Sequence, residues 1–208
     1  ECGEVFSRVI PGVKLPPRNG ISRITAEGTD LIICRTGYTG EDGFEFFCPA
    51  KEGVKWFEAF LGAGAKPCGL GARDSLRLEM CYPLNGSDLS PDKTPLEAGL
   101  GFFCALDTDF IGSDILREQK ANGLSRRLAA IEYTGKGAPP RAHYAVHVPG
   151  GEAIGDLPSG VHAPSLMKGI ALAYLPAAYA KVGMELEIDV RGRKFPAVVV
   201  KKPFYKKG

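Results

Sequence analysis

The chain has 208 residues, enough for one large domain or two small ones. Its hydrophobic fraction of 44% and charged fraction of 24% are typical of a soluble globular protein. The net charge of +2 is too small to argue for nucleic acid or an anionic membrane as a partner, and no apolar run approaches the roughly 18 to 20 residues of a membrane span. We therefore expect no nucleic-acid partner and no membrane partner.

The chain opens with a segment that we expect to be irregular, followed by a hairpin. Residues 1–20 contain several prolines and a glycine, which interrupt regular structure. Ile21–Ala26 and Asp30–Cys34 are two strand-like runs, and the short segment Glu27-Gly28-Thr29 separates them. This arrangement predicts two antiparallel strands joined by a tight turn.

A glycine-rich stretch, Arg35–Glu45 with the sequence RTGYTGEDGFE, comes next and leads into the apolar run Phe44–Cys48. Its three glycines permit positive φ and close approach of a ligand, so the pattern predicts strand, tight turn, strand. If Phe44 and Phe46 share the buried face, Glu45 points the opposite way. A carboxylate fixed there can accept hydrogen bonds from a ligand; the alternative is an ordinary hairpin with a solvated glutamate.

Two helices are predicted after this turn. The first, Glu52–Leu61, has the pattern of a helix packed on a sheet. Its expected buried face consists of Val54, Phe57, Ala59, Phe60 and Leu61. In the second, Lys66–Met80, we expect Leu76 and Met80 to face inward. Arg73 lies beside this apolar stripe and needs a carboxylate or phosphate partner. A ligand could provide that partner, and so could a nearby acid such as Asp74 or Glu79.

In the later part of the chain the sequence pattern changes to short strand-like runs. The pattern predicts an apolar strand at Leu100–Leu106 and a short helix at Phe110–Gln119. The best candidate for a boundary between two domains is Ala121–Ser125. Ser159-Gly160 falls in the longest stretch with no strand signal. The predicted strands after the boundary are Leu128–Tyr133, Tyr144–Val148, Ile170–Tyr174, Met184–Val190 and Ala197–Val200. We predict an α+β fold: an antiparallel sheet with flanking helices in residues 1–120, then a small all-β barrel-like domain in residues 121–208.

The cysteines and histidines do not predict a metal site. Six cysteines are spread along the chain without a CxxC motif, several of them inside apolar runs. This distribution is typical of buried reduced thiols and favours a reducing compartment, so we expect a cytoplasmic protein. His143 and His147 are four residues apart, but their segment reads as a strand, where that spacing is too long for easy joint ligation.

Three residues are the candidates for binding a ligand: Tyr38 in the glycine-rich turn, Glu45 on the strand after it, and Arg73 on a helix. A carboxylate, a phenol and a guanidinium suit a flat ligand with amide-like ring edges and an acidic tail. No serine or cysteine has a histidine at motif distance, and no glycine-rich phosphate loop is present. We therefore identify no catalytic residue from the pattern.

Several motifs in order resemble one family. RTGYTGEDGFE, GLGARDSLRLE, TPLEAGLGF and the closing PFY are similar to the aminomethyltransferase of the glycine cleavage system, the T-protein, and APPRAHY and GIALAYLP extend the resemblance through almost the whole chain. The resemblance implies a transferase in glycine catabolism. It would take the aminomethyl group from the lipoyl arm of the H-protein, release ammonia and pass the one-carbon unit to tetrahydrofolate. It also implies a three-domain cloverleaf, of which residues 1–120 would be part of the folate-binding region.

The resemblance assigns folate-binding roles to five residues. Glu45 matches the glutamate that hydrogen-bonds the pterin ring, Tyr38 a tyrosine of the folate pocket, and Arg73 an arginine that contacts the folate. Phe102 stands where many members have tryptophan, so weaker stacking is expected there. Tyr205 falls near a C-terminal segment that can reach the folate tail.

One departure from the family concerns catalysis. The family's acid–base aspartate lies in a motif of its own, upstream of the glycine-rich motif. No acid of these 208 residues matches that upstream motif. The chain therefore resembles the carboxyl-terminal portion of a T-protein, without the expected catalytic carboxylate. We expect it, in isolation, to bind folate weakly and to turn over slowly or not at all.

Three other kinds of relative remain open as alternatives. Folate-binding relatives in iron–sulfur-cluster assembly lack transfer activity, but they carry a KGCYxGQE-like motif where this chain has RTGYTGEDGFE, which favours the transferase. Sarcosine and dimethylglycine dehydrogenases share the folate domain but need a flavin-binding region that is absent from these residues. Sequence alone distinguishes the glycine cleavage transferase poorly from sulfoniopropionate demethylases.

Overall fold

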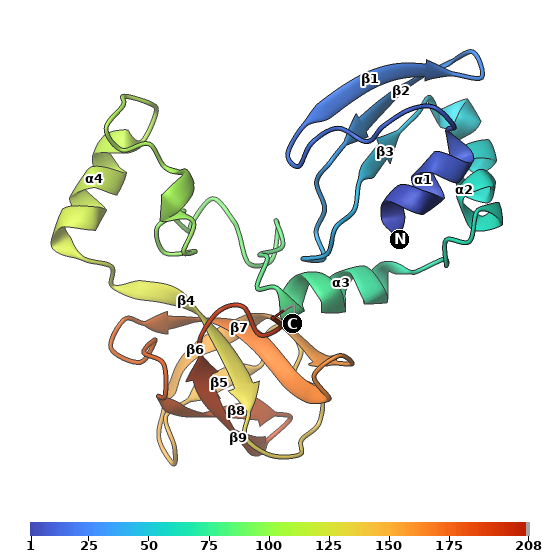
Figure 1. Ribbon diagram of the computed structural model, residues 1–208. Helices are drawn as coiled ribbons and strands as arrows, with labels where there is room; N and C mark the ends of the chain where they lie inside the picture. Colours follow the sequence, from blue (N-terminus) through green and yellow to red (C-terminus); the bar gives the residue numbers. More distant parts are fainter. Residues whose placement is uncertain (207–208) are drawn as a thin grey trace. The chain divides into compact units, whose positions relative to one another are not determined.

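A computed structural model describes residues 1–206, and its internal contacts divide the chain into two compact units (Figure 1). The first unit is Glu1–Arg73 and the second begins at Asp74. The predicted fold class is confirmed, since an antiparallel sheet with helices is followed along the chain by a closed β-barrel. No helix among residues 1–206 is long and apolar enough to cross a membrane.

The first unit is a three-stranded antiparallel sheet with two helices. The strands pair in the order β1 (Ile21–Ala26), β2 (Thr29–Cys34) and β3 (Glu45–Phe47). The predicted hairpin is confirmed: Glu27 and Gly28 both have positive φ, +49° and +73°. Two residues at positive φ form the turn whose twist matches that of antiparallel strands.

Both helices of the first unit pack on this sheet. They are α1 (Cys2–Val9) and α2 (Gly53–Gly62), the latter preceded by the 3-10 turn Ala50–Glu52. Leu31 and Ile33 of β2 form one buried cluster with Phe6 of α1 and Trp56 of α2. Alternate residues of β2 are buried because one of its faces lies against the helices (Figure 1).

Two expectations for this unit were wrong. Residues 2–9 are helical, because Phe6 enters the core and the prolines begin only at Pro11, after the helix has ended. In α2 the buried side chain is Trp56, whereas Val54 and Phe57 of the predicted face are exposed. Apolar residues occur around most of this helix, so periodicity alone did not identify the packed face.

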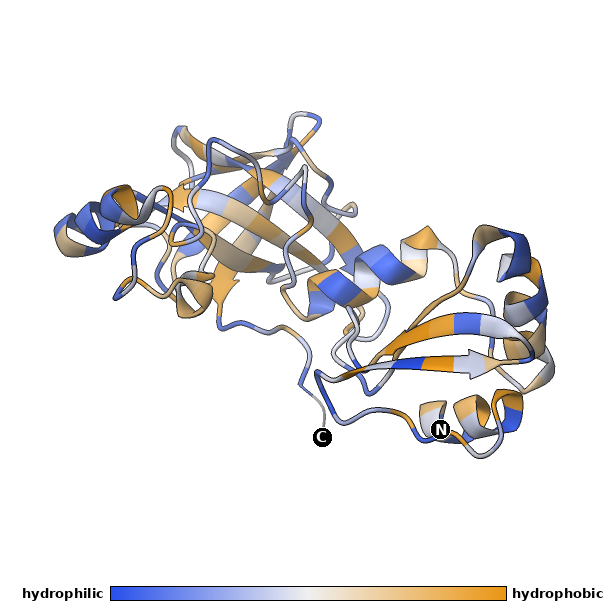
Figure 2. Cartoon of the chain, turned by 90° about the horizontal axis from the view of Figure 1, so that it is seen from above, coloured by the Kyte–Doolittle hydropathy of each residue, from blue (hydrophilic) through white to orange (hydrophobic). Residues whose placement is uncertain are grey.

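The second unit ends in a six-stranded closed barrel with the order β4-β7-β6-β5-β8-β9. Its strands are β4 (Arg126–Tyr133), β5 (Ala145–His147), β6 (Ala153–Ala163), β7 (Lys168–Pro176), β8 (Glu185–Val190) and β9 (Arg193–Val200). Strand β7 is buried on both faces: Ala171 and Ala173 belong to one core cluster and Ile170 and Leu172 to the other. Figure 2 shows the apolar residues in orange along these strands.

The stretch expected to lack a strand is in fact β6, the longest strand of the structure. The sequence around Ser159-Gly160 carries Pro158 and two glycines, which argue against a strand. The structure accommodates Pro158 at a break in register between Asp156 and Ser159. Gly155 and Gly160 are needed because an added Cβ would lie 2.3 Å from the Tyr174 carbonyl oxygen and 2.9 Å from Pro140 backbone, respectively.

Helices precede the barrel. They are α3 (Leu70–Glu79), the 3-10 turn η2 (Gly101–Phe103) and α4 (Ser113–Asn122). The predicted strand at Leu100–Leu106 was wrong, because η2 occupies it and exposes both of its phenylalanines. On α3 the fully buried apolar residue is Leu78, whereas the predicted Leu76 and Met80 are half-buried.

All six cysteines are free thiols, but most are less buried than we expected. Cys81 alone is buried, Cys68 is exposed and the other four are half-buried. Burial raises the pKa of Cys81 to about 11, so this thiol stays protonated near neutral pH.

Candidate functional site

The glycine-rich turn of the first unit is held closed at its base. The guanidinium of Arg35 donates to both carboxylate oxygens of Asp42, at 2.7 Å from Nη2 to Oδ2 and 2.9 Å from Nη2 to Oδ1. Its Nε donates to Oδ1 at 3.1 Å, and the hydrogen bonds to Asp42 raise the pKa of Arg35. The Arg35 amide also donates to the Gly20 carbonyl at 2.9 Å. The segment between Arg35 and Asp42 is therefore fixed at both ends.

Glu45 begins β3 and lies opposite Cys34 of β2. Its side chain is exposed, whereas Phe44 and Phe46 pack against the core cluster, as the alternation predicted. The hydroxyl of Thr36 donates to Glu45 Oε2 at 2.5 Å. Oε1 has no hydrogen-bond partner within residues 1–206. One oxygen is thus oriented by the protein while the other remains available as an acceptor.

Tyr38 and Arg73 lie together. The guanidinium carbon of Arg73 is 4.8 Å from the centre of the Tyr38 ring, the geometry of a cation–π contact. Arg73 is exposed and makes no ion pair with any residue that the structure describes. Asp74, the nearby acid considered from the sequence, accepts hydrogen bonds from Arg77 instead. A guanidinium in contact with a ring face can still donate its N–H groups to a carboxylate.

The two remaining predicted residues, Phe102 and Tyr205, belong to the second unit. Phe102 lies in η2 with 94% of its surface exposed and contacts Phe103 edge-on, with ring centres 5.5 Å apart. Tyr205 is half-buried, and its amide donates to the Glu79 carbonyl at 2.9 Å. The C-terminal segment is therefore attached at Tyr205 to the end of α3.

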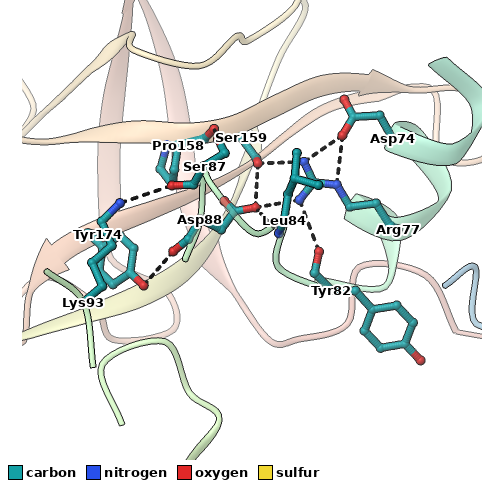
Figure 3. Close-up of polar contacts among 10 residues, drawn as sticks. All are labelled: Asp74, Arg77, Tyr82, Leu84, Ser87, Asp88, Lys93, Pro158, Ser159 and Tyr174. Atoms are coloured by element: carbon teal, nitrogen blue, oxygen red, sulfur yellow. Dashed lines mark hydrogen bonds and ion pairs between the residues drawn. The ribbon is translucent and has the colours of Figure 1, made fainter. Parts of the chain in front are cut away.

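The sequence did not identify a buried ionic network in the second unit (Figure 3). Arg77 Nη1 lies 2.7 Å from Asp88 Oδ2, and its Nη2 donates to Ser159 Oγ at 2.7 Å and to Asp74 Oδ1 at 2.7 Å. Asp88 Oδ2 also accepts from the Ser159 hydroxyl and from the Leu84 amide, each at 2.7 Å.

The same network reaches the barrel through Tyr174 on β7. The Tyr174 hydroxyl donates to the Asp88 carbonyl at 2.9 Å, and burial raises the pKa of Tyr174 to about 12. Ser87 donates to the Pro158 carbonyl, and Lys93 Nζ donates to the Ser87 carbonyl at 3.2 Å (Figure 3). These contacts join the loop after α3 to β6 and β7. The helical spacing of the sequence placed Arg77 on a helix. No signal in the neighbouring sequence indicated its partner Ser159, which lies 82 residues away.

No cluster of three or more histidine, cysteine, aspartate or glutamate side chains within residues 1–206 is placed to hold a metal ion. Arg73, Tyr38 and Glu45 instead offer one cation, one aromatic ring and one carboxylate. The structure brings Arg73 and Tyr38 into contact, and it joins Glu45 to Thr36. Groups of these three kinds can bind an organic ligand through paired hydrogen bonds and charge.

Comparison with known proteins identifies the family. Residues 17–108 match the model of the GCVT N-terminal domain, and residues 126–206 match that of the glycine cleavage T-protein C-terminal barrel domain. An aminomethyltransferase of Bacillus mycoides (strain KBAB4) is 47% identical over 192 residues, which are 89% of this chain and 52% of that protein. One of Picosynechococcus sp. (strain ATCC 27264 / PCC 7002 / PR-6) is 50% identical over 181 residues, 86% of this chain and 49% of that protein.

A solved structure agrees with these matches. The glycine cleavage system aminomethyltransferase T from Bartonella henselae superimposes with a TM-score of 0.79 at 34% identity, over 84% of this chain and 50% of that one. The chain spans about half the length of the relatives it matches. The two domain matches, in the family's order and on the sheet and barrel described above, show that this chain belongs to the glycine cleavage T-protein family.

Proposed function

We propose that this chain supplies a tetrahydrofolate-binding portion of a glycine cleavage aminomethyltransferase. In that reaction the aminomethyl group on the lipoyl arm of the H-protein gives up ammonia, and its one-carbon unit passes to tetrahydrofolate. Residues 1–120 would carry the folate-binding portion and residues 121–208 the barrel domain, in a cytoplasmic protein. Family membership supports the reaction class, and the arrangement of Tyr38, Glu45 and Arg73 supports the ligand.

The observation that carries the proposal is the hydrogen bond between Thr36 and Glu45. It turns the carboxylate of Glu45 to a fixed direction on a short strand, so that two adjacent N–H groups of a pterin ring can be accepted together. Arg73, stacked on Tyr38, would fork onto a carboxylate of the ligand's acidic tail. A rigid acceptor and a rigid donor set reduce the conformational entropy lost on binding.

The family resemblance also assigns folate contacts to two residues of the second unit, Phe102 and Tyr205. Phe102 exposes nearly its whole ring, which is costly in water unless a ligand or partner covers it. We assign it to stacking on the folate. Tyr205, attached to Glu79 through its amide, is assigned to the folate tail.

Replacing Glu45 by glutamine should weaken tetrahydrofolate binding by about 1.5–3 kcal/mol, which is roughly 10- to 150-fold in dissociation constant. Glutamine has nearly the same shape, but one of its two oxygen positions becomes a donor that faces the ligand's N–H groups. Isothermal titration calorimetry with wild type and variant measures the difference.

The matched control is Glu58→Gln, which removes one carboxylate from an exposed position on α2. This control should bind tetrahydrofolate like wild type. Equal affinities of wild type and Glu45→Gln would remove Glu45 from the site. Equal weakening by both variants would assign the effect to net charge.

We further propose that the 208-residue chain binds folate without efficient turnover, because no residue of it stands at the motif of the family's acid–base aspartate. With aminomethylated H-protein and tetrahydrofolate, the expected result is little or no ammonia release above the uncatalysed rate. Full activity of these residues alone would contradict this proposal. Binding without transfer would also match the behaviour of the folate-binding module considered as an alternative.

A further inference from the structure

A cavity of about 410 Å³ opens at one end of the barrel, apart from every residue assigned to folate. Its wall contains three arginines: Arg141 from the loop before β5, and Arg191 and Arg193 from the β8–β9 hairpin. Tyr144 and Phe195 contribute aromatic surface to the same wall. The volume is in the range of pockets that hold small organic molecules.

The hairpin that presents two of these arginines turns through two residues at positive φ, as the β1–β2 hairpin does at Glu27-Gly28. Arg191 and Gly192 form the two-residue turn, with φ of +56° and +83°. Such turns favour asparagine followed by glycine, and a long side chain at the first position is uncommon there because positive φ brings Cβ near the carbonyl oxygen. His143, beside Arg141 in the other loop, also has a positive φ of +69°.

The charges in the cavity are uncompensated. None of the three arginines makes an ion pair with a residue in the described range 1–206, and no acid lines the cavity. Two acids of β8 have other partners: Asp189 Oδ1 accepts from the Gly192 amide at 2.6 Å, and Glu187 lies 3.5 Å from Lys194 Nζ. The guanidinium of Arg193 lies over the Phe195 ring, 5.8 Å from its centre. Like charges held together repel each other unless an anion joins them.

We propose that this cavity binds a small, multiply charged oxyanion of the phosphate class. Guanidinium groups pair with phosphate oxygens through parallel hydrogen bonds, and three of them match a group with two or three negative charges. Phe195 and Tyr144 give the walls an apolar surface for the organic part of such a molecule. This site is independent of the folate assignment, because it uses residues of the barrel alone.

Calorimetric titration with pyrophosphate at low ionic strength tests the proposal. We expect saturable binding to one site in the wild-type chain. Arg141→Gln and Arg193→Gln should each weaken it about tenfold, the loss of one charge-assisted contact, and the combination with Arg191→Asn should abolish it. Arg191→Asn alone should weaken binding while it leaves the melting temperature equal or higher, because asparagine tolerates positive φ.

The control is Arg127→Gln, which removes the same charge from an exposed position on β4. It should change pyrophosphate affinity less than twofold. No saturable binding by wild type at millimolar pyrophosphate would overturn the proposal. Equal weakening by Arg127→Gln and Arg193→Gln would overturn it as well, since the anion would then respond to net charge rather than to this cavity.

Discussion

Replacing Arg77 by alanine should lower the free energy of unfolding of the second unit by about 3–5 kcal/mol. Arg77 is 2% exposed and Asp88 is fully buried, and their side chains are 2.7 Å apart. Removing the guanidinium leaves a buried carboxylate without its ion-pair partner, which is among the most costly changes a single substitution makes.

Lys202 acts on Asp88 electrostatically, but among residues 1–206 only Arg77 forms an ion pair with it. Its Oδ1 is buried with no hydrogen-bond partner in the described structure, and Oδ2 retains only the Leu84 amide and the Ser159 hydroxyl once Arg77 is gone. Asp74 and Ser159 also lose the donors that Arg77 provided. The loop after α3 should then detach from β6.

Urea denaturation followed by far-UV circular dichroism of the barrel strands measures this loss. The matched control is Lys168→Gln, which breaks the exposed pair with Glu132, 3.1 Å apart. Exposed ion pairs contribute about 0–1 kcal/mol, so the control should stay near wild type. A loss below about 1 kcal/mol for Arg77→Ala would show that the network does not stabilise the unit.

Replacing Phe6 by alanine should lower the free energy of unfolding of the first unit by about 3–5 kcal/mol. Phe6 is 1% exposed, and its ring meets Phe44 edge-on with centres 5.2 Å apart. The substitution removes the side chain by which α1 enters the core, and it leaves a cavity beside Leu31 and Trp56. We expect α1 to separate from the sheet before the rest of the unit unfolds.

Trp56 is the single tryptophan of the sequence and lies in this core cluster, so its fluorescence reports the first unit. The control is Phe57→Ala on α2, where the ring is 59% exposed; it should change stability by about 0.5 kcal/mol or less. Similar losses for the two variants would contradict the packing described for α1 and α2.

The hairpin, the glycine-rich turn and five barrel strands could be predicted because their signals are local. Alternating apolar residues and glycine at a turn depend only on neighbours in the sequence. Strand β6 could not be predicted in this way, because Pro158 is tolerated only through a register break against β7. Helix α1 was missed because a helix this short is stabilised by tertiary packing, here by Phe6 in the core, rather than by local helix propensity.

The candidate site was predicted in part. The alternation around Glu45 correctly indicated an exposed carboxylate between two aromatics that pack against the core cluster. The stacking of Arg73 on Tyr38 joins residues 35 positions apart, and spacing could not specify it. The sequence suggested an acidic partner for Arg73. In the structure the arginine of α3 that forms a buried ion pair is Arg77, because its position on the helix is buried.

The most direct test of the central claim is to follow backbone amide chemical shifts of the chain by NMR during a titration with tetrahydrofolate. We predict that the largest shifts occur in residues 36–45 and at Arg73, and that they saturate together with one dissociation constant. Unchanged amides in this segment, with binding detected elsewhere or not at all, would contradict it.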